Sequence, residues 1–336
     1  MRSDRSSSIH GHGRVLCAVL MLLCCCALRA QDPPADPPLE EVAVVGQHKG
    51  PQMWRVTAGD HVLWILGTLQ PLPKAMTWDA RDVENVLAEA QEVIPEYIAL
   101  DAGSLALLRL YPKWRRIQVL KNGQTLKQVL PVDLYAQFSL LRDRYGSGPA
   151  DMEHMQPLFA AQRLKEEAID KTGLTAAANI QATVLKLARA HHVTVRNLTL
   201  QVQDPQELLQ EAGELPIAAQ SACLEPVVAT LEKAMGVLRA RANAWALGDV
   251  QTLRTLQPVN TGGGNLCWQA AAGTTHIANL GQRLHQLWMD AVNDALRTHT
   301  SSLAVQDIDS LLGGMLAELR TAGYSVEGPG FSGAAQ

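Results

Sequence analysis

Two largely apolar segments open the folded part of the chain, and the turn signal between them predicts how they pair. Residues 53–56, Met-Trp-Arg-Val, are expected to form a short strand, and residues 62–66 are an apolar run of strand length. Between them lies Ala58-Gly59-Asp60-His61, a turn signal with Gly59-Asp60 at its centre. We therefore expect a β-hairpin at the start of the folded region.

A loop, a helix and a third strand are expected after this hairpin. The loop Gly67-Thr-Leu-Gln-Pro-Leu-Pro73 is stiffened by two prolines. Asp79 is expected to cap a helix that runs to about Gln91. Residues 92–98 are expected to form a strand, with Pro95 restricting where it can pair. Strand, loop, helix and strand make an α/β unit, whose ligand site is expected in the loop after the first strand.

Most of the remaining chain repeats its apolar residues at helical spacing. Helices are expected over 105–145 (broken at Gly123 and Pro131), 157–172, 175–190, 218–247 (bent at Pro226), 277–298 and 308–322. Further strands are expected at 193–200, 301–305 and 324–327. The pattern predicts a helix-rich α/β fold, with a small sheet fed from both ends of the chain.

The first 30 residues have the pattern of a secretory signal peptide. Three arginines and a single acid precede an unbroken apolar run of 14 residues, from Val15 to Leu28. Such a run is short for a membrane span and suits a signal-peptide core, although a retained membrane anchor is the alternative. Cleavage is expected after Ala27 or Ala30. The periplasm or the extracellular space is therefore the expected location.

Composition divides the rest of the chain into three parts. Residues 31–50 form a Pro-rich, acidic linker, 51–328 a globular domain, and 329–336 a small, polar tail expected to be disordered. No second apolar run approaches the length of a membrane span.

Charge and cysteine content narrow the expected partners. The formal net charge is −4, and removing residues 1–30, which carry four Arg and one Asp, would bring it near −7. Nucleic acid is therefore an unfavourable partner, and Arg115-Arg116 beside Lys113 is interpreted as a solvated surface. Of six cysteines only Cys223 and Cys267 lie beyond the leader, and two thiols in an oxidising compartment are expected to form a disulfide.

Three segments resemble the TraB/GumN family. MWRVTAGDHVLWILGTLQPLPKAMTWDARDVENVLAEAQEVI is similar to the family's opening, in which a hairpin ends in Gly-Thr-x-His. RARANAWALGDVQTLRTL, residues 239–256, resembles its arginine-alanine-tryptophan-glycine-aspartate junction. LRTHTSSLAVQDIDSLLGGMLAELRTAGYSVEGP resembles its closing strand, helix and Gly-Tyr-x-Val strand. The resemblance spans about residues 53–329 and implies a small mixed sheet between helical layers.

The resemblance also implies a metal-dependent hydrolase site, since the family includes secreted proteases of the TIKI type with paired Gly-x-x-His motifs. This chain departs from those motifs. Gln70 occupies the position of the first His, and residues 301–314 contain no Gly-x-x-His. An amide is a weak ligand for zinc-like ions compared with imidazole. His299 is a possible substitute ligand, but we expect no metal and no other cofactor.

Three hypotheses on function follow from these departures. The first is a catalytically degenerate protein that binds a polar ligand or an envelope protein. The second is a peptidase-like hydrolase with a rebuilt, metal-free site that uses Gln70, Glu96 and Arg297, and the third is a purely structural envelope protein. The sequence favours the first, with a candidate pocket formed by Gly67, Thr68, Gln70, Glu96 and Arg297.

Cleavage of the leader is directly testable. N-terminal sequencing of the protein recovered from the cell envelope fraction should give a start at Leu28 or Gln31, because small residues end the apolar run there. A mature protein that begins at Met1 and sediments with membranes would contradict this expectation.

Overall fold

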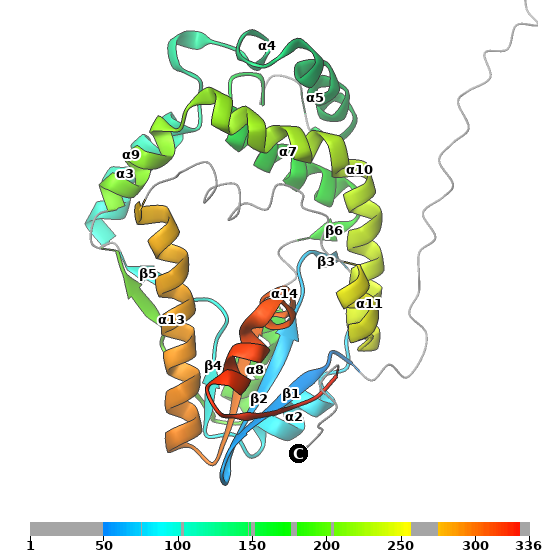
Figure 1. The fold of residues 1–336 in the computed structure, drawn as a ribbon, viewed down its shortest axis with the longest axis vertical. Coiled ribbons are helices and arrows are strands. Elements are labelled where there is room, and N and C mark those ends of the chain that lie inside the picture. Colours follow the sequence, from blue (N-terminus) through cyan, green and yellow to red (C-terminus); the bar gives the residue numbers. More distant parts are fainter. Residues whose placement is uncertain are drawn as a thin grey trace, which may run out of the picture. The chain divides into compact units, whose positions relative to one another are not determined.

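The structure is a computed structural model, and it describes residues 50–329 with internal gaps at 75, 102–103, 147, 149–151, 176–179, 203–204 and 257–274 (Figure 1). The expected signal peptide, most of the linker and Cys267 lie outside the described residues. Cys223 is buried in helix α10 (Ile217–Leu247). Its pairing with Cys267 stays a prediction.

A six-stranded mixed sheet forms the centre of the fold. Its strand order is β10 (Ser325–Glu327), β1 (Met53–Ala58), β2 (His61–Thr68), β9 (Ser301–Asp307), β4 (Glu92–Ile94) and β7 (Thr194–Val195). The first three strands pair antiparallel, and the predicted hairpin is confirmed as β1 and β2. From β2 to β7 all neighbours are parallel. Both ends of the chain therefore contribute to one sheet, as the apolar pattern indicated.

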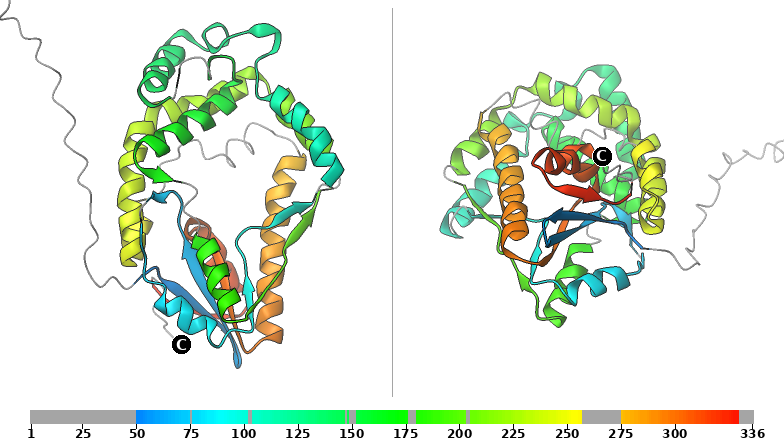
Figure 2. Two further views of the ribbon diagram at one scale, coloured as in Figure 1. Left: turned by 180° about the vertical axis from the view of Figure 1, so that it is seen from behind. Right: turned by 60° about the horizontal axis from the view of Figure 1, so that its bottom comes forward.

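Helices cover both faces of this sheet. Helix α13 (Thr275–Thr298) packs on one face, and α2 (Arg81–Leu87) with α8 (Ile180–Ala190) lies on the other (Figure 2). The central strands β2 and β9 supply fully buried side chains to the core between these layers. A strand buried on both faces reads as a continuous apolar run, which explains the pattern at 62–66 and the shorter run at 303–305. The fold is thus α/β, with a small mixed sheet between helical layers.

A second hydrophobic cluster lies mainly among helices. It joins α4 (Leu126–Val129), α5 (Val132–Tyr145), α7 (Pro157–Lys171) and the first part of α10. The last turns of α10 instead bury Ala242, Trp245 and Ala246 in the core around the sheet. Helix α10 therefore connects the two clusters. Among the described residues, no helix combines the length and apolar character needed to cross a membrane.

The remaining elements are short or lie at the edges. They are α3 (Ser104–Ile117), a 3₁₀ turn (Lys121–Gly123), α9 (Pro205–Glu214), α11 (Val250–Thr255), α14 (Ile308–Ser310), a π-turn (Leu311–Met315) and α15 (Leu316–Thr321). Two strand pairs stand apart from the main sheet. These are β3 (Leu72–Pro73) with β6 (Leu174–Thr175) and β5 (Ala99–Asp101) with β8 (Thr199–Gln201).

Several predicted boundaries were wrong. The strand expected at 92–98 ends at Ile94, because Pro95 cannot donate a ladder hydrogen bond. The strand expected at 193–200 is split into β7 and β8, which belong to different sheets. Asp79 does not cap a helix. It accepts the backbone N–H of Arg81 at 3.0 Å, and α2 begins only there. Thr175 pairs with Leu72 as a strand residue and does not cap α8.

Gly67, the second-last residue of β2, sits where no side chain fits. A Cβ atom there would lie 2.9 Å from Trp54 Cζ3 and 3.1 Å from Ile308 Cγ1. We predict that Gly67→Ala lowers the free energy of unfolding by about 1–3 kcal/mol, the usual cost of overpacking a core. Urea unfolding followed by circular dichroism measures this change.

The matched control is Gly236→Ala in α10. A Cβ there meets nothing within 4 Å, so the variant should gain up to about 1 kcal/mol from helix propensity. Equal changes in the free energy of unfolding for Gly67→Ala and Gly236→Ala would contradict the predicted steric clash at Gly67.

Candidate functional site

The parallel strands end at one edge of the sheet, and polar side chains gather there. Thr68 closes β2 and Asp307 closes β9, and the two are register partners. Glu96 follows β4 by two residues. Because the carboxyl ends of parallel strands meet at the same edge, this is where an α/β fold offers a ligand site.

Thr68 and Glu96 are joined by a short hydrogen bond. Thr68 Oγ1, on a residue only 3% exposed, donates to Glu96 Oε2 at 2.6 Å. Glu96 itself is half-buried. The sequence predicted that these two residues share a site, and the structure brings them into contact.

A second contact forms next to the first. Gln70 Nε2 donates to the hydroxyl of Tyr97 at 2.6 Å, and the Tyr97 side chain is 48% exposed. The predicted Gln70 thus lies on the loop whose side chains meet the segment after β4. We call Thr68, Gln70, Glu96, Tyr97 and Asp307 the strand-end cluster.

Gln181 on α8 fixes the segment that carries Glu96. Its side-chain Oε1 accepts the backbone N–H groups of Glu96 and Tyr97 at 2.5 and 3.1 Å. Gln181 is 6% exposed, so this amide is a buried support. This role was not predicted from the sequence, because nothing in the pattern at 180–190 marks one polar residue on the inner face of a helix.

Burial raises the pKa of both carboxyl groups in the strand-end cluster. For Glu96 burial is the main cause, the Thr68 hydrogen bond opposes it, and the nearby charge of Asp307 adds to it. The pKa of Asp307 is raised mainly by burial, against hydrogen bonds from Ser310. Asp307 was not predicted as a site residue. Two carboxyls that disfavour each other's charge hold protons more readily than isolated ones.

The arginine-tryptophan-glycine-aspartate junction lies directly behind this cluster. Trp245 Nε1 donates to the backbone carbonyl of Gly67 at 2.8 Å, which fixes the end of β2. Gly248 adopts φ +69° and ends α10, and Asp249 caps α11 through the N–H of Thr252 at 2.9 Å.

Arg241, in the same junction, is a buried clamp. It is 1% exposed and donates to the carbonyl of Leu253 at 3.2 Å, to the carbonyl of Leu256, and to Asp309 on α14. The guanidinium therefore joins the end of α11 to the helix that follows Asp307. Such a clamp positions the cluster without belonging to it.

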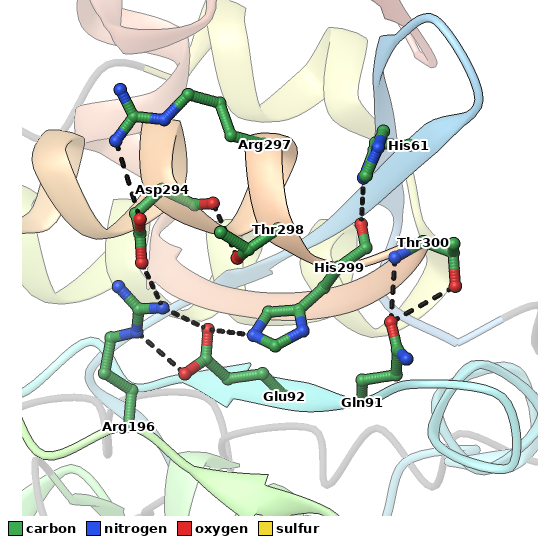
Figure 3. Close-up of polar contacts among 9 residues, drawn as sticks. All are labelled: His61, Gln91, Glu92, Arg196, Asp294, Arg297, Thr298, His299 and Thr300. Carbon is green, nitrogen blue, oxygen red and sulfur yellow. Dashed lines mark hydrogen bonds and ion pairs between the residues drawn. The ribbon is translucent and has the colours of Figure 1, made fainter.

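Arg297 does not belong to the strand-end cluster. It lies near the end of α13, before β9 begins, and so at the opposite edge of the parallel strands (Figure 3). Its guanidinium is 70% exposed and lies 3.5 Å from Asp294 Oδ1. The prediction that Arg297 joins Glu96 was wrong, because β9 runs parallel to β2 and β4, which places the residues before β9 at the edge opposite to Glu96.

His299 also lies at that opposite edge. Its Nε2 is 3.6 Å from Glu92 Oε2, and its backbone carbonyl contacts His61 Nδ1 at 2.7 Å (Figure 3). Arg196 joins Glu92 to Asp294 with ion pairs of 2.7 and 2.8 Å. These contacts tie β4, β7 and α13 together. His299 therefore cannot serve as a substitute ligand in the strand-end cluster.

The strand-end cluster does not fit the metal that the family resemblance implies. Its donors are two carboxyls, a threonine hydroxyl, a phenol and an amide. Catalytic zinc-like ions take three protein ligands, mostly imidazole or carboxylate. Across the part of the chain that the structure describes, no group of three or more His, Cys, Asp or Glu side chains could hold a metal ion. The arrangement is instead suited to hydrogen bonding and, with two protonatable carboxyls, to proton transfer.

The raised pKa of Glu96 makes stability depend on pH. The folded state keeps a proton that the unfolded chain releases near pH 4.5, so stability falls as the pH rises from 4.5 through the folded pKa. We predict that Glu96→Gln, which cannot ionise, becomes progressively more stable relative to the unmodified protein over this interval. Urea midpoints at a series of pH values measure the difference. Glu89→Gln, at an exposed position, is the control, and parallel curves for all three proteins would contradict the assignment.

Comparison with known proteins supports the family resemblance. A family model described as the TraB/PrgY/gumN family matches residues 52–328. No curated protein and no solved structure matches the chain. Since the match covers the whole sheet, both hydrophobic clusters and the strand-end cluster, the chain belongs to the TraB/PrgY/gumN family.

Proposed function

We propose that this TraB/PrgY/gumN family protein is exported and binds a polar ligand at the strand-end cluster without bond cleavage. Export rests on the leader-like pattern of residues 1–30, and N-terminal sequencing tests it. Ligand binding rests on the geometry at the carboxyl ends of β2, β4 and β9.

The observation that carries the proposal is the convergence of polar side chains from two separate loops. Thr68 meets Glu96 at 2.6 Å, and Gln70 meets Tyr97 at 2.6 Å. Neither contact is needed to close the sheet, because the strands pair through their backbones. Buried Gln181 and Arg241 nevertheless hold the segments in place. A site of this kind is preorganised by the rigid elements around it.

The chemistry of the cluster indicates the class of ligand. The Gln70 amide and the Tyr97 hydroxyl can both donate and accept hydrogen bonds. Glu96 and Asp307, with raised pKa values, can donate when protonated and accept when ionised. Peptide amides and sugar hydroxyls present the same mixture of donors and acceptors. We therefore assign a peptide or a saccharide as the ligand class.

A hydrolase with a rebuilt site is the second candidate. The observation that favours it is the pair of half-buried carboxyls, Glu96 and Asp307, with raised pKa values at one strand end. Two such groups in different protonation states can act as general acid and general base. The set Gln70, Glu96 and Arg297 is not retained for this role, because Arg297 lies at the other edge of the sheet.

The two candidates and the metal question are separated by one set of measurements. We expect dialysed protein to hold well below one equivalent of zinc, manganese or iron, because two carboxyls supply too few ligands. Peptidase and esterase panels should show no activity that a chelator removes. Near one equivalent of metal together with chelator-sensitive activity would reject the binding proposal in favour of a metal-dependent hydrolase. Activity that survives the chelator and is lost in Glu96→Gln would instead favour the metal-free hydrolase.

Substitution at the loop gives a direct readout of binding. Peptides and oligosaccharides that raise the melting temperature of the protein should lose that effect in Gln70→Ala and in Tyr97→Phe, since both side chains are at the surface of the cluster. The control is Gln210→Ala, an exposed amide on α9. Ligands that act equally on all three variants would show that the strand-end cluster is not where they bind.

A further inference from the structure

One stretch of this acidic protein is strongly basic. Residues 109–127 contain six cations and no acid, although the whole chain carries a net charge of −4. The cations are Arg109, Lys113, Arg115, Arg116, Lys121 and Lys127. The charge of +6 in this stretch exceeds in magnitude the net charge of −4 of the whole chain, so the stretch is a distinct electrostatic feature.

The structure places the first four of these cations on the outer side of α3. Their side chains are all exposed, whereas Leu110 on the same helix is buried and Ile117 is half-buried. Arg109, Lys113 and Arg116 follow the i, i+4, i+7 spacing that aligns side chains on one face of a helix. We call these three residues the α3 basic stripe.

The inner side of α3 is held by its neighbours. A Cβ at Gly213 of α9 would lie 2.7 Å from Ile117 Cγ2, which shows how closely the two helices pack. Lys113, exposed at the border of this helix contact, donates from Nζ to Gln206 Oε1 of α9 at 3.3 Å, and α9 also carries Glu207, Glu211 and Glu214. Within the described residues no carboxylate forms an ion pair with the α3 basic stripe.

Exposed apolar groups lie on the same helix and in the chain on either side of it. Among the described residues eight large hydrophobic side chains are exposed, and five of them lie between residues 97 and 119: Tyr97, Leu100, Tyr111, Trp114 and Val119. Tyr111 is 62% exposed, and Trp114, whose edge meets Phe159 at 5.6 Å between ring centroids, is still 39% exposed. Exposed apolar side chains gathered in one segment mark an interaction surface more often than scattered ones do.

We propose that the outer face of α3 binds the surface of an anionic phospholipid membrane. The aligned cations match the chemistry of an anionic headgroup layer, where they pair with lipid phosphates. Tyr111 is exposed on a different side of α3 from the stripe, since residues two apart on a helix do not face each other, so it contributes less to this surface than the cations do. The charge sign selects anionic over neutral lipid. The exposed aliphatic side chains of Leu100 and Val119, which lie before and after α3 in the sequence, suit a lipid layer better than nucleic acid, which is bound by cations interleaved with base-stacking rings.

Vesicle sedimentation tests the proposal. The purified protein should bind vesicles of phosphatidylcholine with 30% phosphatidylglycerol at low ionic strength, bind pure phosphatidylcholine weakly, and be released by 0.5 M NaCl. The triple variant Arg109→Gln/Lys113→Gln/Arg116→Gln should bind the anionic vesicles roughly a hundredfold more weakly, about fivefold for each cation removed. Tyr111→Ala should weaken binding to the anionic vesicles less than the triple variant does.

The matched control removes three exposed cations elsewhere: Lys186→Gln/Arg189→Gln/Lys233→Gln. Equal loss in both triple variants would reduce the effect to net charge and overturn the proposal. Binding that survives both salt and the α3 variant would come from an uncleaved apolar leader and would also overturn it. So would tighter binding to an oligonucleotide than to vesicles at equal phosphate concentration.

Discussion

The parallel pairing of β2 with β9 is the contact on which the rest of the structure depends. Residues 62–68 pair in register with residues 301–307, so about two thirds of the chain lies between two adjacent strands. Leu63, Ile65, Leu303 and Val305 are fully buried, and this two-sided burial makes the pairing favourable. A pairing of such long sequence separation carries a large entropic cost of loop closure, which only the burial of a continuous core can offset.

The register of this pair also creates the strand-end cluster. It sets Thr68 beside Asp307, and the neighbouring pairing of β9 with β4 brings Glu96 to the same edge. A slip by one residue would turn every side chain of β2 to the other face of the sheet. Gly67 resists such a slip, because Trp54 and Ile308 leave no room for a side chain there. The same contacts that specify the core therefore position the polar groups.

Local sequence signals predicted the elements better than their contacts. The hairpin, the long helices and strand β9 are confirmed, since apolar spacing and turn residues determine such elements locally. Pro95 was expected to limit strand pairing. The next strand, β5, was not predicted as a separate element, because it forms by pairing with the distant β8. Likewise, residues 193–200 resemble a single strand in the sequence. In the structure β7 pairs with β4 and β8 pairs with β5, in two different sheets.

The site was predicted in part for the same reason. Thr68, Gln70 and Glu96 follow two strands of one α/β unit, so the general position of ligand sites in such units identified them. Asp307 was not predicted, because it reaches the cluster only when β9 lies between β2 and β4. Gln181 was not predicted, because its contact with the segment after β4 depends on which side of α8 faces the sheet. Arg297 was assigned to the wrong edge of the sheet. The sequence places it just before β9 but does not show that β9 runs parallel to β2.

The hydrogen bonds inside the strand-end cluster determine how a ligand would enter it. A ligand must exchange existing bonds for its own, and the net gain from each exchange is small unless the replaced bond is already open to water. The bond between Gln70 and the exposed Tyr97 meets this condition, whereas the bond from the buried Thr68 to Glu96 does not. A ligand would therefore first replace water and the Gln70–Tyr97 contact at the surface. Only a ligand that also bonds Glu96 could compensate for opening the buried contact, and this second step gives the cluster its selectivity.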